Sequence, residues 1–510
     1  MDTPNDCYQI MIVDNGRIVS LFKEQEFQAK NLNEDSVTKL QGFVFPGFID
    51  SHIHMVSYAK YMDYVDLQSV QSIEELVEKV TEKASNSQAG DWIIGVGWNQ
   101  EKFQEHRYPC KEDLDKIPGN HPIMLNRVCT HILVCNSIVL KIGGISKLTR
   151  NPVGGVIDKD KNGNPTGILR ETAMDLIKNL IPKPSFEDQI RWLKTAQTAL
   201  NSYGITSIHT LDEDCYPIYQ KFKENLTLRV YFCPKYKELD KLYKIEPGAR
   251  TGLGDDMLRL GRLKVFADGS LGAQTAALRE PYEHSQNYGI STHPKKELMH
   301  IIIEMDKLGW QIETHAIGDK AAEITLDCYE TIYKHNYRPV LNHCQILGED
   351  LIQRMADLEI IASIQPIFIE QDMDFVEKFI GIQRMTYAYA WKSLLNYGIH
   401  CSGGSDAPVD SPNPLFGIYA AVTRQKLVGY PENGWIPKQK LSMGEALHLF
   451  TTGAAYAEYQ EHQKGALKLG YLADFVLLDK DLFHISPVEI PSVKVLKTFV
   501  GGKEVFSRSK

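Results

Sequence analysis

The sequence lacks any long hydrophobic run, any dense basic tract and any closely spaced pair of cysteines. No stretch approaches the roughly 20 uncharged apolar residues that a membrane-spanning helix needs. The N-terminal residues do not contain the basic segment and apolar core that are typical of a secretory signal. The nine cysteines include no CxxC pair, a pattern that favours free thiols in a reducing cytosol over a disulfide framework. We therefore expect a cytoplasmic protein with no membrane partner.

The charge balance also excludes a class of partner. The formal net charge is −9, and no Lys/Arg tract is present that would follow the phosphates of a nucleic acid. The chain has 510 residues and is 43% hydrophobic, as is ordinary for an enzyme. Its length fits one large α/β domain with appendages or two to four smaller domains. We expect a small-molecule substrate and no nucleic acid, and the sequence leaves a homodimer open.

The two ends of the chain have similar patterns of short β-type runs. An Asn-Gly hairpin signal lies at 15–16, and a Gly-Gly pair takes the corresponding position at 501–502. Neither end is long enough to bury a sheet alone. We therefore predict that residues 1–46 and 458–510 combine into one small β-sandwich.

Between the two ends, apolar β-branched runs alternate with segments of helical period. This alternation implies parallel strands, and eight such units in a chain of this size favour an α/β fold of the closed (β/α)₈ TIM-barrel type over residues 47–457. The eight runs lie at 43–54, 204–210, 226–232, 261–269, 310–319, 339–346, 359–366 and 397–408.

One spacing in this pattern is too long for a single helical connection. The segment from His54 to Gly204 separates the first predicted strand from the second. Connections of this length are usually folded units or functional lids. We predict an inserted mixed α/β subdomain at about residues 85–175, after the first barrel strand.

The first predicted strand ends in the pattern His-Ile-His. Residues i and i+2 of a strand point to the same face, so His52 and His54 project together, with Asp50 beside them. In a barrel this face is the interior, and active sites are built at the C-terminal ends of the strands. Imidazole is the commonest side-chain metal ligand. Taken alone, the pattern is equally compatible with two exposed histidines at the end of a strand.

Three later strands also end in groups that bind metals. His315, His343 and Asp406 each lie near the C-terminal end of a predicted strand, and the fold brings all of these ends to one rim. Nitrogen and oxygen ligands without cysteine suit Zn²⁺, with Mn²⁺, Fe²⁺ or Co²⁺ as alternatives. The sequence therefore predicts a divalent metal site at this rim.

Lys264 lies inside an apolar strand, where an ammonium group is costly to bury. One explanation is a buried salt bridge, for which Asp268 is a candidate partner. The other is that the desolvated amine, with a lowered pKa, reacts with CO₂ to form a carbamate. The carbamate would be an anionic oxygen ligand able to bridge two metal ions.

Taken together, these motifs resemble the amidohydrolase superfamily, in particular its branch of N-substituted formamide deformylases. The resemblance rests on GFIDSHIH, KVFADGSLGAQTAAL, HAIGDKA, SDAPVDSPNPLFGIYAAVTR and KGALKLGYLADFVLLD, and it spans essentially the whole chain. It implies a (β/α)₈ barrel, a β-sandwich built from both termini, an inserted subdomain and one or two bound metal ions. The implied metal ligands are His52, His54, Lys264 as its carbamate, His315, His343 and Asp406, the last also acting as general base.

The activity that follows is hydrolysis of an amide-type C–N bond, such as that of an N-formyl or N-acyl amine. His131, in the insertion, is a candidate for polarising the substrate carbonyl, with a structural role as the alternative. A lactonase or phosphoesterase on the same metal centre and a catalytically inactive binding scaffold are the rival interpretations. The chain departs from its relatives at Gln274, where many carry Arg, and at Asn99, where many carry Asp. These departures concern substrate contacts, because Gln cannot replace Arg as a bidentate grip on an anion.

Overall fold

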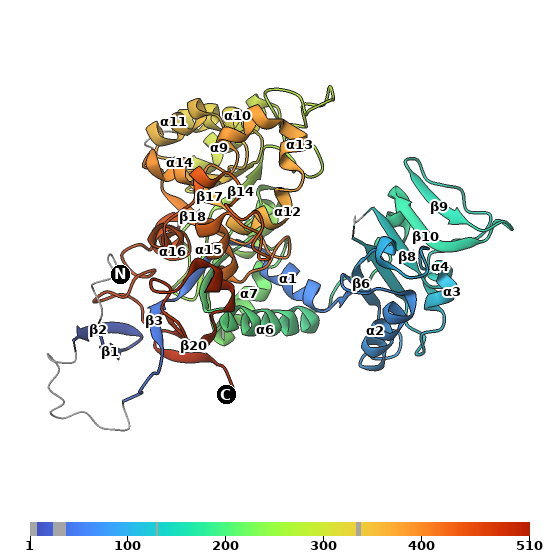
Figure 1. The fold of residues 1–510 in the computed structure, drawn as a ribbon, viewed down its shortest axis with the longest axis horizontal. Coiled ribbons are helices and arrows are strands. Elements are labelled where there is room, and N and C mark those ends of the chain that lie inside the picture. The colour runs from blue at the N-terminus through green and yellow to red at the C-terminus, as the bar shows by residue number, and fades with distance from the viewer. Residues whose placement is uncertain (1–7, 24–36, 129–130, 333–337, 510) are drawn as a thin grey trace. The chain divides into compact units, whose positions relative to one another are not determined.

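The computed structural model describes residues 8–23, 37–128, 131–332 and 338–509. Parts of the predicted terminal module, at 1–7 and 24–36, lie outside these residues. The chain divides into two compact units (Figure 1). Unit 1 consists of Met1–Tyr58 and Gln189–Lys510, and unit 2 is the segment Ala59–Asp188. In the described residues, no helix has both the length and the apolar character needed to cross a membrane.

Two parallel sheets form the centre of unit 1. Most of their strand residues are buried, as expected for strands that helices cover. In the first sheet the order is β13 (Leu258–Leu260), β12 (Arg229–Phe232), β11 (Ile205–Thr210) and β4 (Phe48–Ile53). In the second sheet the order is β14 (Leu263–Phe266), β15 (Ile312–Ala316), β16 (Val340–His343), β17 (Ile361–Ile364) and β18 (Cys401–Gly403).

Additional backbone hydrogen bonds link both edges of the second sheet, at β18 and β14, to the first sheet. At one edge, the N–H of Asp406, just after β18, donates to the carbonyl of His52 in β4 at 2.7 Å. At the other, the N–H of Lys264 in β14 donates to the carbonyl of Pro234, just after β12, at 2.8 Å. The sequence predicted one continuous sheet of eight strands, whereas the strand pairing divides the parallel strands between two sheets and adds β13.

Amphipathic helices connect the strands of the second sheet. In α9 (Lys295–Lys307) and α11 (Glu349–Asp357), the buried apolar residues recur at helical spacing, and the opposite faces are charged. α11 also places two carboxylates in its first turn, where they complement the helix dipole. The connections include α10 (Asp319–Tyr329) between β15 and β16 and α14 (Trp391–Asn396) between β17 and β18. This strand–helix alternation was expected from the sequence.

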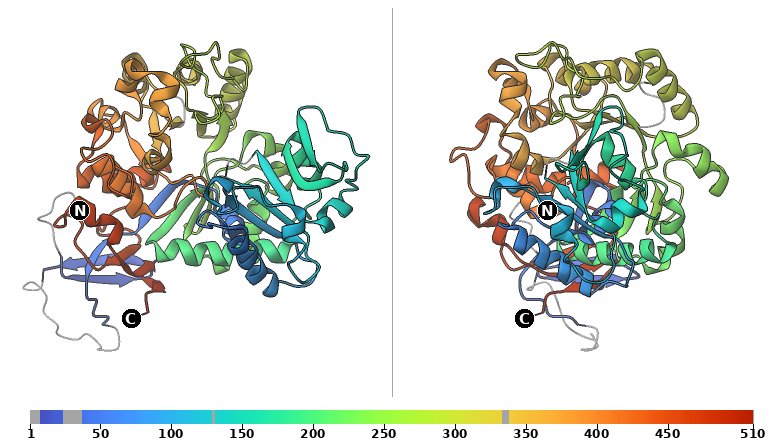
Figure 2. Two further views of the ribbon diagram at one scale, coloured as in Figure 1. Left: turned by 45° about the vertical axis from the view of Figure 1, so that its right-hand side comes forward. Right: turned by 90° about the vertical axis from the view of Figure 1, so that its right-hand side faces the viewer.

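Strands from both ends of the chain share one antiparallel sheet. Its order is β21 (Lys503–Ser507), β20 (Val495–Val500), β19 (Phe475–Leu478) and β3 (Phe43–Pro46). A separate hairpin of β1 (Ile10–Asp14) and β2 (Arg17–Phe22) turns at 15–16, where both residues have positive φ. Figure 2 shows blue strands from the first fifty residues beside red strands from the last fifty. Their packing as a β-sandwich stays a prediction.

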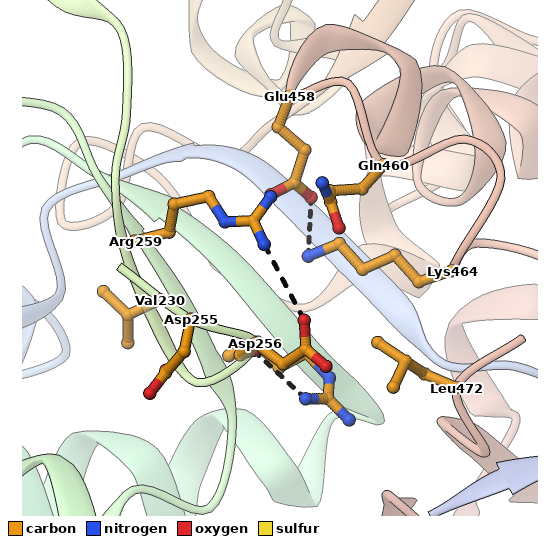
Figure 3. Close-up of a pocket in the computed structure, with 9 residues that line it drawn as sticks. Val230, Asp255, Asp256, Arg259, Glu458, Gln460, Lys464 and Leu472 are labelled. Atoms are coloured by element: carbon orange, nitrogen blue, oxygen red, sulfur yellow. Dashed lines mark hydrogen bonds and ion pairs between the residues drawn. The ribbon is translucent and has the colours of Figure 1, made fainter. Parts of the chain in front are cut away.

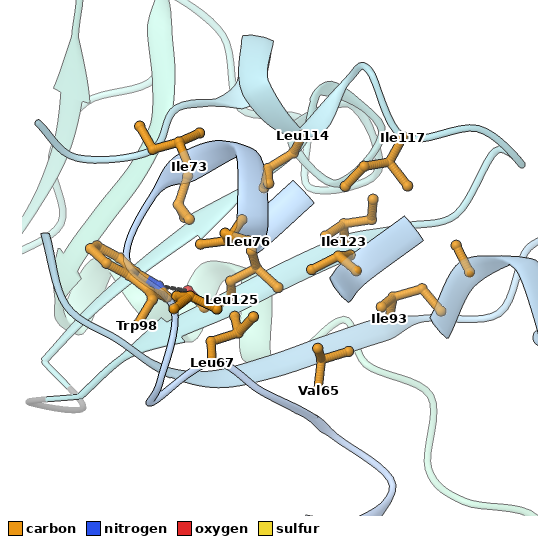
Figure 4. Close-up of a cluster of buried hydrophobic side chains, with 14 of the residues drawn as sticks. Val65, Leu67, Ile73, Leu76, Ile93, Trp98, Leu114, Ile117, Ile123 and Leu125 are labelled. Carbon is orange, nitrogen blue, oxygen red and sulfur yellow. Dashed lines mark hydrogen bonds between the residues drawn. The ribbon is translucent and has the colours of Figure 1, made fainter. Parts of the chain in front are cut away.

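Unit 2 is built on a mixed six-stranded sheet, and the subdomain predicted at about 85–175 lies inside it. On one face of the sheet, α2 (Ile73–Ser85) packs over a cluster of apolar side chains (Figure 4). Trp98 is fully buried there and donates from Nε1 to the carbonyl of Leu125 at 2.9 Å. The strand order is β5 (Val65–Asp66), β6 (Ile93–Trp98), β7 (Ile123–Arg127), β8 (Ile132–Cys135), β10 (Pro165–Glu171) and β9 (Gly155–Lys159).

Candidate metal centre

Three of the predicted ligands converge in unit 1. The Nε2 atom of His54 lies 3.1 Å from Oδ1 of Asp406, and Nε2 of His52 lies 3.4 Å from the same oxygen. One ligand atom from each of the three residues falls within 4.8 Å of the others. Two imidazoles and a carboxylate at this separation fit a single divalent cation such as Zn²⁺. The donor set and its spacing therefore suit a metal ion.

The loop after β18 has a local structure that brings Asp406 to this position. Asp406 adopts a φ of 56°, a left-handed conformation that is uncommon outside glycine. Gly404 packs so closely on β4 that a Cβ atom there would lie 2.6 Å from the backbone nitrogen of His52. The buried Asp50 carboxylate accepts hydrogen bonds from the Ser405 hydroxyl at 2.6 Å and from the backbone N–H groups of Ser405 and His52, each at 3.1 Å. The end of β4 and this loop are therefore held together.

The other two predicted histidine ligands lie in the same cluster of rings. The ring centroids of His315 and His343 are 4.5 Å apart, and those of His343 and His52 are 5.3 Å apart. His315 directs Nε2 to the carbonyl of Gly269 at 2.9 Å. His343 contacts Oε1 of Gln365 through Nδ1 at 2.8 Å. The ring centroids of His52 and His54 are 5.8 Å apart, so the four imidazoles form a chain of neighbouring rings. The assignment of His315 and His343 as ligands stays a prediction.

Lys264 is 2% exposed, and its ion-pair partner is not the one considered from the sequence. Its Nζ lies 3.3 Å from Oε1 of Glu313. The Asp268 carboxylate instead accepts backbone N–H bonds from Gly318 at 2.8 Å and from Ala277 at 3.0 Å. Burial lowers the pKa of Lys264, although Glu313 acts in the opposite direction. A lowered pKa favours the neutral amine that carbamate formation requires.

Glu313 was not identified from the sequence. Its side chain is fully buried, and besides Lys264 it contacts Nδ1 of His52 through Oε1 at 3.0 Å, Nε of Arg262 through Oε2 at 2.7 Å, and the side-chain amide of Asn342. A signal for it exists, because Glu313 lies two residues before His315 on one strand and shares its face. A buried carboxylate in a strand requires partners, and the sequence did not show which strands would supply them.

Burial and neighbouring charges together determine the pKa values of the groups in the centre. Burial alone would raise the pKa of Asp406, but His52 and His54 hold it well below its usual range, so the group is an anion near neutral pH. Burial likewise would raise the pKa of Glu313, but Arg262, Lys264 and His52 together hold it well below its usual range. Burial lowers the pKa of His315 to about 3, so this imidazole is neutral, as a metal ligand must be.

The remaining residues that the sequence singled out belong to unit 2 or to a loop of unit 1. His131 belongs to unit 2, where its largely exposed ring contacts Oε2 of Glu171 at 3.0 Å, and its role in carbonyl polarisation stays a prediction. Asn99, also in unit 2, accepts hydrogen bonds from the backbone of Glu101 at 3.2 Å and from Arg127 at 3.3 Å. Gln274 adopts a φ of 53° in the loop after β14.

The fold and this cluster define a class: an α/β protein with a histidine–carboxylate centre of metal-binding type at the ends of parallel strands. A model of the amidohydrolase family matches residues 41–506. The chain belongs to the amidohydrolase family, which confirms the resemblance seen in its motifs.

Known proteins are similar to this chain over nearly their whole length. It is 34% identical over 490 residues to the protein YtcJ of Bacillus subtilis (strain 168), covering 93% of this chain and 91% of YtcJ. It is 26% identical to the N-substituted formamide deformylase of Arthrobacter pascens, covering 100% of this chain and 97% of that enzyme. A crystal structure of an uncharacterized metal-dependent hydrolase from Pyrococcus furiosus superposes with a TM-score of 0.77 at 29% identity, covering 93% of this chain and 95% of the other.

Proposed function

We propose that this protein is a metal-dependent hydrolase that cleaves an amide-type C–N bond in a small molecule, such as an N-formyl or N-acyl amine. The observation that carries the proposal is the convergence of His52, His54 and Asp406, whose ligand atoms lie within 4.8 Å of one another. The structural likeness to a metal-dependent hydrolase and the sequence similarity to a formamide deformylase support it.

The proposal includes a closed barrel. In it, β4, β11 and β12 continue through the edge hydrogen bonds into β14–β18, which gives eight parallel strands in a ring. The C-terminal ends of such strands form one rim, where TIM-barrel enzymes carry their active sites. The described cysteines are free thiols, which supports the cytoplasmic location expected from the sequence.

The proposed metal is Zn²⁺, as one or two ions. The residues that would hold it are His52, His54, Lys264 in its N6-carboxylated form, His315, His343 and Asp406. When bound, Zn²⁺ would lower the pKa of a coordinated water to about 7 and would stabilise negative charge that develops on the substrate carbonyl oxygen.

Asp406 has the position and charge of a general base. Its carboxylate is an anion near neutral pH, and its Oδ1 lies against both His52 and His54. In the proposed reaction Asp406 accepts a proton from the attacking water and then donates it to the leaving nitrogen, so that the amine departs neutral. His131 would contribute by polarising the carbonyl.

A substrate screen combined with elemental analysis tests the proposal. We expect the purified protein to contain zinc and to hydrolyse N-formyl or N-acyl amines faster than lactones or phosphotriesters. Fold and metal centre do not determine which bond is cleaved, so the comparison must include all three substrate classes. Preference for the oxygen esters would refute the amide assignment, and absence of zinc together with absence of turnover would refute the hydrolase.

A further inference from the structure

We propose that Glu313 is a positioning residue that orients two metal ligands, His52 and Lys264, through a single carboxylate oxygen. The inference rests on the proposed metal centre. It assigns a role to a side chain that is fully buried and, in this proposal, is not itself a ligand. Arg262 anchors Glu313 from the opposite side.

The contacts of the Glu313 carboxylate divide between its two oxygens. Oε1 lies 3.0 Å from Nδ1 of His52 and 3.3 Å from Nζ of Lys264. Oε2 accepts a hydrogen bond from Nε of Arg262 at 2.7 Å. One oxygen thus faces the metal centre, and the other is held by a guanidinium group. The orientation of the carboxylate is fixed by this division.

This geometry determines which nitrogen of His52 carries the hydrogen. An ionised carboxylate only accepts hydrogen bonds, so a bare Nδ1 at 3.0 Å from Oε1 would bring two lone pairs together. By the same argument, Nε2, at 3.4 Å from Oδ1 of Asp406, is free of hydrogen only when a cation lies between them, so Nδ1–H with Nε2 as the ligand atom is the tautomer of the metal-bound centre. The side-chain amide of Asn342, which also lies near Nδ1, can then donate to Glu313. A carboxylate that fixes the tautomer of a ligating histidine raises metal affinity.

The same oxygen is placed to orient Lys264 after carboxylation. CO₂ adds to the neutral Nζ, a new N–C bond forms, one proton leaves to solvent, and the carbamate nitrogen keeps one hydrogen. That hydrogen can donate to Oε1 of Glu313, as the amine does at 3.3 Å. The carbamate oxygens are then left free for the metal. Without this acceptor, rotation about the lysine side chain would leave the carbamate without a fixed orientation.

Arg262 makes this arrangement possible in the interior. It is fully buried, and besides Glu313 it donates to the carbonyl of Ser51 at 3.1 Å and contacts Nδ1 of His209 at 3.1 Å. Its guanidinium lies 2.7 Å from Oε2 and supplies the opposite charge that a buried carboxylate requires. Because Oε2 is occupied by Arg262, the carboxylate cannot turn that oxygen toward the metal ligands without losing a charge-assisted bond.

Zinc affinity and carbamate content of the Glu313→Gln variant test the role. The amide has a single acceptor oxygen, whereas Arg262 and His52 each donate one hydrogen bond to the carboxylate. One of these two hydrogen bonds is therefore lost. We expect Zn²⁺ affinity, measured on the full chain by competition with a chelator, to fall by about 10- to 100-fold. The carbamate ¹³C signal after incubation with labelled bicarbonate should decrease as well.

Glu458→Gln is the matched control. Glu458 is 4% exposed and pairs with Lys464 at 2.6 Å (Figure 3). It also lies 3.2 Å from Nε2 of His209, so its link to Arg262 is indirect. The same substitution there removes a buried charge without touching His52 or Lys264. We expect this variant to retain wild-type zinc affinity and carbamate signal, which would separate loss of positioning from a general effect of removing a buried carboxylate.

A second variant covers the case in which Glu313→Gln does not fold because Arg262 is left unpaired. Replacing Arg262 and Glu313 together by Met removes both charges. Removal of a whole buried ion pair costs less stability than loss of one partner. The same decrease in zinc affinity is expected. Wild-type affinity and full carbamate signal in whichever variant folds would overturn the inference while leaving the proposed function in place. A wild-type chain that binds no metal would overturn both.

Discussion

Replacing Asp406 with Asn gives the sharpest test of the proposed chemistry. Oδ1 of Asp406 lies 3.1 Å from His54 and 3.4 Å from His52, and Asn has nearly the same shape, so we expect the fold to be retained. The amide cannot accept the proton that the carboxylate takes. A positioned general base contributes about 10²- to 10⁴-fold in rate. At 1.36 kcal/mol for each tenfold change, the barrier should rise by about 2.7–5.4 kcal/mol.

The assay measures kcat and kcat/KM on the best amide substrate, with zinc content determined on the same preparation. We expect kcat to fall by at least about 100-fold, with most of the zinc retained. Asp158→Asn is the control, because Asp158 belongs to unit 2, where its carboxylate pairs with Arg170 at 2.7 Å. Turnover of Asp406→Asn at the wild-type rate would exclude this residue as the base.

Three further predictions concern metal binding and stability. His52→Ala should release metal, and a full complement of zinc in elemental analysis would contradict its assignment. Gly404→Ala places a Cβ 2.6 Å from the nitrogen of His52, so we expect a loss of about 1–3 kcal/mol in unfolding free energy; an unchanged urea midpoint would argue against this close approach. Burial raises the pKa of Asp372 to about 6, so its charge costs stability as pH rises from the unfolded value of 3.8 through 6. Between pH 4 and pH 8, the unfolding free energy of Asp372→Asn should therefore increase relative to that of the wild type. A relative decrease would contradict the destabilising effect of the buried charge.

The sequence predicted the parts of this site that follow from periodicity. His52 and His54 share a face because side chains alternate along a strand, and Asp406 was expected nearby because it also follows a strand. Both expectations depend only on local pattern and on the direction of parallel strands. The structure brings these three residues together.

What the sequence did not reveal depends on pairing between distant strands. Glu313 and Arg262 are polar residues in apolar runs that the sequence did not single out, and their contact at 2.7 Å accounts for both. Lys264 showed the same ambiguity, since the choice between Asp268 and Glu313 as partner depends on how the side chains of neighbouring strands meet. The division of the parallel strands into two sheets likewise depends on hydrogen bonding that periodicity does not determine.

The shared terminal sheet has a consequence for biosynthesis. β3 pairs with β19, and Phe45 lies opposite Val476 although more than 400 residues separate them along the chain. During synthesis β3 must therefore wait, with an open edge, until β19 has emerged. Pairing between residues so far apart is slow, and unpaired edges promote aggregation. Nascent chains arrested before β19 is made should therefore associate with chaperones.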